Sequence, residues 1–148
     1  MPALYWLKLW QPGDSERDNI PLSLLVDWIA RCPFTNSCLL LSKESILYGE
    51  GRIQTIWGTA IEERFAKMIG FSLEAKPEYL PSHECVQTII CLNEDLTISA
   101  SDLEKVRLFI RQNQYEIIGR SVSRFFYSIM ANDKLVRYDH LWIPIKKR

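Results

Sequence analysis

The sequence lacks the features that would indicate a membrane span or an export signal. No apolar run in its 148 residues approaches the ~20 residues that a membrane helix needs. The first residues, MPALYWLKLWQPGD, have neither a basic n-region nor a small-residue cleavage site. We therefore expect a soluble cytoplasmic protein that has no membrane contact.

Groups that carry common catalysis are also scarce. His83 and His140 are the only histidines. The sequence contains no glycine-rich phosphate loop, no HExxH, no CxxC and no serine elbow. From these absences we predict no cofactor, no metal and no catalytic residues.

The four cysteines, Cys32, Cys38, Cys85 and Cys91, are expected to be reduced thiols because no export signal accompanies them. Cys85 and Cys91 fall in one predicted strand, where six residues span ~20 Å, so the two cannot share a metal or a disulfide there. The least favoured functional hypothesis is a cysteine- or metal-dependent enzyme around Cys85, His83 and His140, in which Cys85 or Cys91 would pair with His140.

Periodicity indicates both helices and strands. Alternating or β-rich segments predict strands at 3–10, 37–48 with a bulge near 43–44, 52–57, 85–92 and 141–146. Helical spacing of apolar residues predicts helices at 21–31, 59–70, 101–112 and 117–131. Capping boxes at Thr59 with Glu62, and at Ser101 with Glu104, support two of these helices.

The first six elements follow the order β-α-β-β-α-β, which is typical of a ferredoxin-like, split-βαβ sheet. We therefore predict a single α+β domain over 1–148, with a mixed or antiparallel sheet and helices on one face. Residues 1–92 would form the core, and 101–148 would add a basic, long or broken helix and a strand. Pro144 places that last strand at a sheet edge. Such a fold does not specify a function.

The absence of net charge conceals an uneven distribution. Residues 1–100 carry 8 Lys and Arg against 13 Asp and Glu, a net charge of −5, whereas residues 101–148 carry 10 against 5, a net charge of +5. Any nucleic-acid binding must therefore reside in the last third.

The basic third offers one candidate surface. Arg107 and Arg111 are spaced for one helix face, and Arg120 and Arg124 repeat that spacing. Read as helix, turn, helix and hairpin, the segment has the outline of a winged helix that would bind nucleic acid. Its candidate contacts are Arg107, Arg111, Arg120, Arg124, Lys134 and Arg137. The alternative is that these side chains form the solvated face of an amphipathic helix.

Aromatic and acidic residues offer a second candidate surface. Among the five tryptophans, Trp28 lies off the apolar stripe of its predicted helix and Trp142 lies in the predicted edge strand, so both are candidate interface anchors. An acidic loop adds Asp14, Glu16 and Asp18.

We predict a non-enzymatic interaction module that binds and regulates or inhibits a partner protein, or serves as an assembly subunit. Nucleic-acid binding is the alternative, and self-association stays open.

Overall fold

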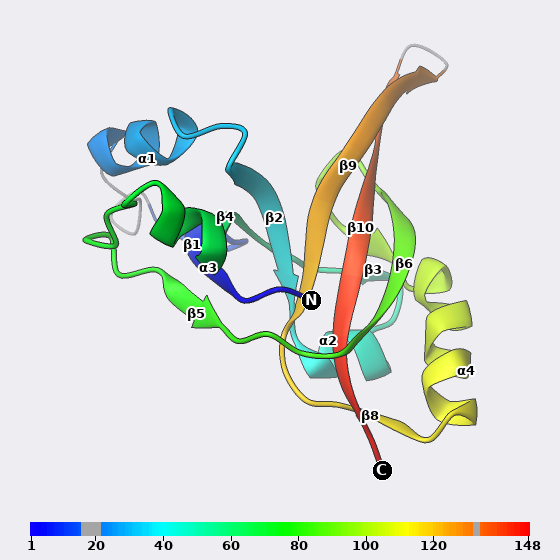
Figure 1. The fold of residues 1–148 in the computed structure, drawn as a ribbon. Coiled ribbons are helices and arrows are strands. Elements are labelled where there is room, and N and C mark those ends of the chain that lie inside the picture. Colours follow the sequence, from blue (N-terminus) through cyan, green and yellow to red (C-terminus); the bar gives the residue numbers. More distant parts are fainter. Residues whose placement is uncertain (16–21, 132–133) are drawn as a thin grey trace.

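A computed structural model of the chain describes residues 1–15, 22–131 and 134–148. It is built on one ten-stranded sheet that curls into a half-barrel, in the order β3-β7-β6-β10-β9-β2-β4-β1-β5, with β8 paired to β10 (Figure 1). Every strand pairing found among the described residues is antiparallel. The protein is therefore mostly β.

Strands occur over the whole length of the chain. They are β1 (Leu4–Trp10), β2 (Thr35–Leu41), β3 (Arg52–Ile53), β4 (Ile56–Glu62), β5 (Glu78–Leu80), β6 (Cys85–Leu92), β7 (Ile98–Ser99), β8 (Tyr115–Ile117), β9 (Ser121–Ala131) and β10 (Lys134–Lys147). The helices are short: α1 (Leu22–Ile29), α2 (Lys43–Tyr48), α3 (Glu63–Met68), the 3-10 turn η2 (Ala100–Leu103) and α4 (Glu104–Gln112).

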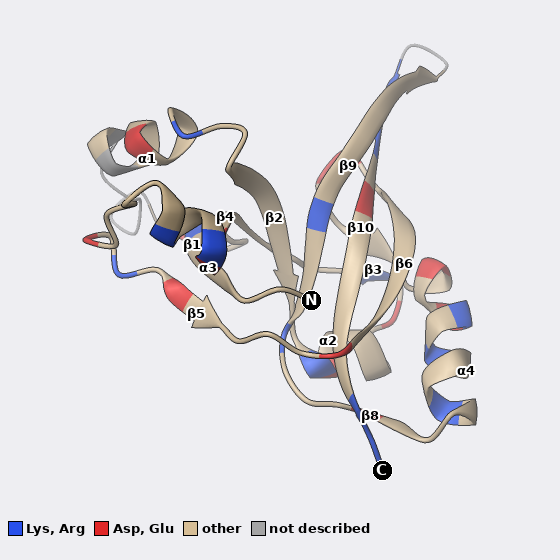
Figure 2. Cartoon of the chain, viewed as in Figure 1, with Lys and Arg blue, Asp and Glu red and all other residues tan. Residues whose placement is uncertain are grey.

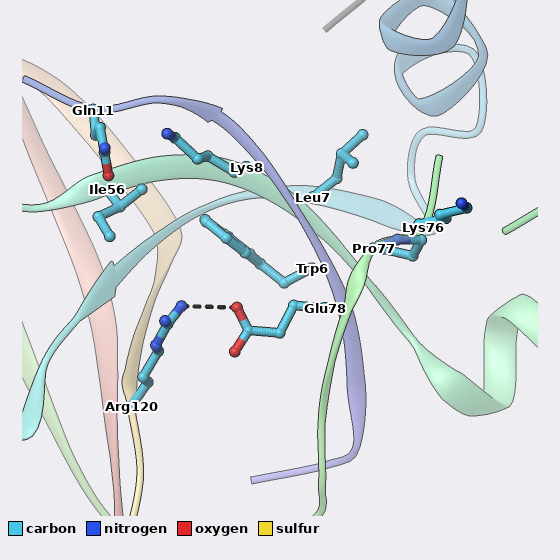
Figure 3. A pocket seen from close by; sticks show the side chains of 9 residues that line it. All are labelled: Trp6, Leu7, Lys8, Gln11, Ile56, Lys76, Pro77, Glu78 and Arg120. Carbon is cyan, nitrogen blue, oxygen red and sulfur yellow. Dashed lines mark hydrogen bonds and ion pairs between the residues drawn. The ribbon is translucent and has the colours of Figure 1, made fainter. Parts of the chain in front are cut away.

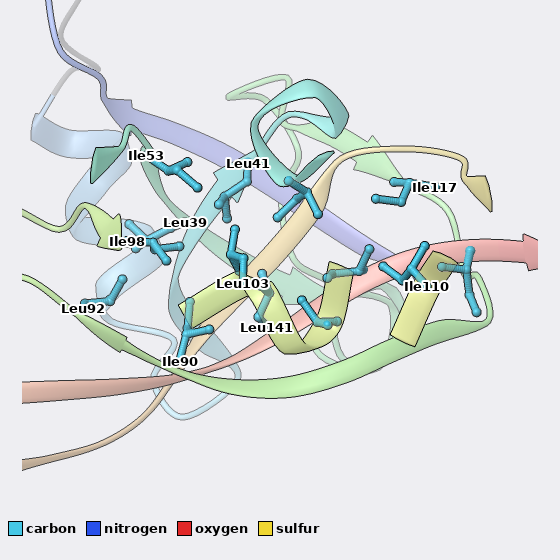
Figure 4. Close-up of a cluster of buried hydrophobic side chains, with 14 residues drawn as sticks. Leu39, Leu41, Ile53, Ile90, Leu92, Ile98, Leu103, Ile110, Ile117 and Leu141 are labelled. Carbon is cyan, nitrogen blue, oxygen red and sulfur yellow. The ribbon is translucent and has the colours of Figure 1, made fainter. Parts of the chain in front are cut away.

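The described helices pack on one face of the sheet. The larger core cluster joins Leu39 and Leu41 of β2 and Leu141 of β10 to Val106 and Ile110 of α4 (Figure 4). A second cluster on this face joins β1 and β4 to α1 and α3, and contains Leu7, Trp28, Ile61 and Ala66. Since alternate residues of a strand face opposite sides, the other face is left to a different set of side chains.

That other face, which we call the open face, has a smaller core around Trp6. Leu4, Trp6, Cys38, Leu40 and Val122 are among its buried members. A Cβ at Gly58 would lie 2.5 Å from Trp6 Nε1 and 2.4 Å from the Leu7 carbonyl oxygen, so only glycine leaves room for the indole.

The prediction of a ferredoxin-like α+β fold is wrong. In the structure β1 lies between β4 and β5, and the chain forms a curled, mostly β half-barrel.

Strands were correctly predicted at 3–10 and 85–92, which match β1 and β6. The helix expected at 59–70 begins only at Glu63, because β4 continues through Glu62 beside β1 and β2. Residues 45–48 are helical in α2 instead of extended.

The largest error lies in residues 117–131, which were predicted to be helical. They form the end of β8 and the long strand β9, which pairs with β10 as a hairpin. The aromatic and β-branched residues that matched a helical stripe are also the residues that favour strands. The predicted C-terminal long or broken helix and the winged-helix outline are therefore both wrong.

Pro144 does not mark a sheet edge, because β10 lies between β6 and β9. Pairing with β9 ends at Trp142, and pairing with β8 begins at Ile145. Ile145 donates its backbone N–H to the Glu84 carbonyl oxygen on the β6 side, so the nitrogen of Pro144 faces the gap between β9 and β8. A residue without a backbone N–H is tolerated at that point.

Candidate interaction surface

The guanidinium of Arg107 binds the protein's own backbone. It donates to the carbonyl oxygens of Ile46 at 2.6 Å, Gly49 at 2.7 Å and Ser45 at 3.3 Å. These carbonyls lie in or just after the last turn of α2, where acceptors often lack an intrahelical partner, although that of Ser45 also accepts the Gly49 backbone N–H. Arg107 therefore fixes α2 to α4. Arg111, one turn further along α4, is exposed and takes part in none of the ion pairs described.

The other four basic candidates pair with carboxylates. Arg120 lies 2.7 Å from Glu78 and Arg124 lies 3.3 Å from Glu62, while Lys134 at the hairpin end lies 3.0 Å from Glu94. Arg137 makes a two-pronged contact with Asp139, at 2.7 and 3.0 Å. Basic residues are spread over several elements of the chain (Figure 2).

Asp139 is the most deeply buried of these carboxylates, with no exposed area. Besides Arg137 it accepts a hydrogen bond of 2.8 Å from Ser123 Oγ, across the β9–β10 pairing. The guanidinium of Arg137 also lies over the ring of Phe125, 5.2 Å from its centroid. This arrangement fastens the two strands together and neutralises Arg137.

Arg120 borders a hollow on the open face, with a cavity of about 420 Å³ lined by Trp6, Lys8, Gln11, Lys76 and Glu78 among others (Figure 3). Two of its cations are engaged, since Lys8 pairs with Asp14 at 2.9 Å and Arg120 pairs with Glu78. Trp6 Nε1 is buried without a hydrogen-bond partner, but it lies against Gly58. The hollow offers mixed charges and no converging catalytic groups.

The acidic loop is only partly described. Asp14 accepts hydrogen bonds from Lys8 Nζ and from the backbone N–H of Gln11, both at 2.9 Å, so its carboxylate closes the turn after β1. Glu16 and Asp18 lie outside the described residues.

The two tryptophans selected from the sequence lie in different surroundings. Trp28 is only 2% exposed and meets Phe71 edge-on at 4.8 Å, so it packs in the core beneath α1, while Ile29 beside it is exposed. Trp142 is half-buried on the open face, where it packs against the Trp6 core and beneath the guanidinium of Arg124, 5.8 Å from the ring centroid.

The cysteines and histidines do not assemble into a site. Burial raises the pKa of Cys38 to about 12, which keeps its thiol protonated, and burial also raises the pKa of Cys91. His140 is hydrogen-bonded through Nδ1 to Gln87. All four cysteines are free, and the described residues contain no cluster able to hold a metal ion.

An exposed aromatic surface does appear on the open face of the β9–β10 hairpin. Phe126 lies against His140, with ring centroids 4.2 Å apart and planes tilted by 30°, and Tyr127 stacks on Tyr138 at 4.9 Å with the two planes 9° apart. Ile129 extends the row toward the hairpin end. We call Phe126, Tyr127, Ile129, Tyr138 and His140 the hairpin face. Phe126, Tyr127 and Ile129 are 49%, 41% and 43% exposed.

A β-bulge creates this concentration of rings. Tyr127 pairs with Tyr138 and Phe125 pairs with Asp139, so Phe126 is an extra residue in β9. Adjacent residues of a regular strand point to opposite faces, but at the bulge Phe126 and Tyr127 lie on the same face, with their rings edge-on at 5.0 Å.

Sequence reasoning missed the hairpin face because it assigned β9 to a helix. The signal that could have found it is the run Phe125-Phe126-Tyr127, followed by Tyr138 and His140 at strand spacing. Read with a period of two on a hairpin, those residues fall on facing positions.

Comparisons with family models, with curated proteins and with solved structures found no match to this chain. In the described part of the chain, no helix combines the length and the hydrophobicity needed to cross a membrane.

Proposed function

We propose that this chain is a non-enzymatic module that binds a partner protein through the hairpin face, and so regulates, inhibits or helps to assemble that partner. The single observation that carries the proposal is the row of stacked, half-exposed aromatic rings on a hairpin that extends beyond the rest of the sheet (Figure 1). Four free thiols suit a reducing compartment, so we place the module in the cytoplasm.

Aromatic side chains are suited to protein interfaces because they bury a large area and have few rotatable bonds. The stacked pairs also hold one another in place, which lowers the entropy that binding would remove. His140 and the Tyr127 and Tyr138 hydroxyls add polar groups at the margins of the rings. The hairpin face therefore has the composition expected of an interface centre.

Nucleic-acid binding is the alternative, since exposed rings can also stack on bases. Such binding requires cations that neutralise phosphates. Arg120, Arg124, Lys134 and Arg137 each already pair with a carboxylate, and Arg107 is held by backbone carbonyls. The charge distribution therefore favours a protein partner.

The proposal is tested by affinity capture from a lysate of the source cells, with and without nuclease. The variant Phe126→Ala/Tyr127→Ala removes two rings that are already exposed. The matched control, Tyr48→Ala, removes a ring that is 75% exposed on α2. Thermal unfolding of each variant checks that it is folded.

We expect wild type and the Tyr48→Ala control to capture the same proteins, whether or not nuclease is present. The double variant should lose them by about tenfold or more, because truncation of an interface anchor costs at least ~1–2 kcal/mol. Equal capture by a folded double variant would refute the proposal, as would an empty capture by wild type. Capture that nuclease abolishes would replace it with the nucleic-acid alternative.

A further inference from the structure

The outer part of β9 has a free backbone edge. β2 pairs with β9 only from Leu41 opposite Ser121 to Cys38 opposite Arg124, and then continues beside β4. Beyond the bulge at Phe126, the segment from Tyr127 to Ala131 pairs with β10 alone among the described strands. One side of this five-residue segment therefore presents unpaired backbone groups that another strand could bind.

A bulge at Phe126 precedes this edge, but the edge lacks two other features by which proteins protect sheet edges, namely shortness and charge. β3 has two residues and begins with Arg52, and β5 has three and begins with Glu78. The β9 segment is longer than either and reads YSIMA, with no charged residue and no proline. Such an edge is expected to be covered when the protein functions.

We propose that the Tyr127–Ala131 edge pairs antiparallel with the same edge of a second copy of this chain, across a two-fold axis centred on Ile129. This pairing rests on the proposed function, because both give the hairpin a docking role. It adds that a second copy of the chain occupies the backbone edge of the hairpin.

Charge supports a second copy as the occupant. Antiparallel pairing about Ile129 places Tyr127 of one copy opposite Ala131 of the other, and Ser128 opposite Met130, so no charged side chains meet. The nearby cations of β10, Lys134 and Arg137, are each neutralised within their own copy by Glu94 and Asp139. A two-fold contact needs a self-complementary patch, and this segment satisfies that condition.

The pairing would also enlarge the hairpin face. Two paired hairpins form a four-stranded sheet in the order β10-β9-β9-β10. Side chains that share a face of one hairpin then lie on the same face of this sheet as their counterparts in the other copy. The stacked rings of Phe126 with His140 and of Tyr127 with Tyr138 would then lie on both sides of the paired Ile129 residues. The dimer would present one continuous aromatic surface, and two equivalent sites, to a partner.

The oligomeric state of the purified chain tests the pairing. Light scattering coupled to size exclusion should give twice the 17.3 kDa of one chain for wild type at high concentration. Ile129→Lys should give a single chain at the same concentration, because the two-fold axis would bring two ammonium groups together. The control Met68→Lys adds the same charge at a 63% exposed position on α3 and should remain dimeric.

Crosslinking tests the register. Directly opposed residues of antiparallel strands have Cα atoms ~4.5–5.5 Å apart, within the range of a disulfide. Under mild oxidation Ile129→Cys should form a reducible dimer at least tenfold faster than wild type, whose native thiols provide the background. Wild type that stays monomeric up to millimolar concentration, or an Ile129→Cys variant that crosslinks no faster than wild type, would overturn the pairing.

The two proposals fail separately. If purified protein is monomeric but the Phe126→Ala/Tyr127→Ala variant still loses its captured proteins, only the dimer is refuted. If Ile129→Lys abolishes a dimer and capture does not depend on the rings, only the partner-binding function is refuted.

Discussion

The two halves of the β9–β10 hairpin are formed by the same two strands but differ in how deeply their side chains are buried. In the inner half, which we call the root, Ser123, Asp139 and Leu141 have no exposed surface. In the outer half, the tip, Ile129 is 43% exposed and Leu135 is 62% exposed. The root and the tip are continuous along both strands.

The neighbouring strands explain this difference. At the root, β9 is flanked by β2, and β10 is flanked by β6 as far as Arg137 opposite Leu92. Further out, β2 follows β4 and β6 ends, so the tip has two strands without support from the rest of the sheet. We therefore expect the root to contribute more to stability than the tip, whose apolar side chains are exposed.

The largest expected effect comes from the carboxylate buried in the root. Asp139→Ala would leave Arg137, which is only 19% exposed, without its carboxylate, and would leave Ser123 Oγ without its acceptor. Removing one partner of a buried pair costs about 3–5 kcal/mol. Chemical denaturation should show a loss of that size in the free energy of unfolding.

The matched change at the tip is Lys134→Ala, which breaks an ion pair whose side chains are 70% and 69% exposed. An exposed pair contributes about 0–1 kcal/mol, so this variant should unfold close to wild type. A comparable loss of stability in both variants would show that the tip is as important to folding as the root.

A smaller effect is expected from apolar truncation. Leu141→Ala removes a fully buried side chain from the core beneath α4 and should cost about 2–5 kcal/mol. Leu135→Ala removes the same atoms at the tip and should change the free energy of unfolding by under about 0.5 kcal/mol. Parallel urea titrations of the two variants measure both values. Similar midpoints for the two would contradict the division.

The sequence predicted some strands well, for reasons visible in particular residues. Cys85 to Leu92 is rich in β-formers and is bounded by turn residues, so local preference and tertiary context agree. Helix α4 was also found, and Val106 and Ile110 are its buried residues, but it begins at Glu104 and the predicted capping box of Ser101 with Glu104 is not formed. By contrast, β4 overrides a plausible capping box at Thr59, whose hydroxyl binds the Asn36 carbonyl oxygen at 3.3 Å instead.

The hairpin could not be predicted by counting apolar positions. Val122, Phe125, Phe126 and Ile129 fit a helical stripe, and only pairing with β10 reveals that a bulge shifts the period at Phe126. The partners of the arginines were equally hidden, because Glu62 and Glu78 are 62 and 42 residues away from Arg124 and Arg120. Contacts between residues far apart in the sequence therefore determine both where the candidate site lies and which carboxylates its arginines bind.

The smallest expected effect is acid sensitivity beside the tip. Asp95 accepts hydrogen bonds from Thr97 Oγ1 at 2.6 Å and from the Thr97 backbone N–H at 3.1 Å, and it pairs with Arg52 at 2.9 Å. These contacts, the Thr97 hydroxyl first, lower the pKa of Asp95 below 3.8. The adjacent Glu94 holds Lys134. Protonation of Asp95 should therefore loosen the loop that carries Glu94, the partner of Lys134.

Because the pKa is lower in the folded chain, the stabilisation is complete above the ordinary value of 3.8 and is lost as the pH falls through the folded value. The difference in unfolding free energy between wild type and Asp95→Asn should therefore shrink in acid. Amide chemical shifts of Lys134 and Leu135 should follow the Asp95 titration in wild type and lose that step in Asp95→Asn. Leu141, in the root, should not report it. A root amide that titrates with Asp95 would show that the two halves of the hairpin are coupled more tightly than their packing indicates.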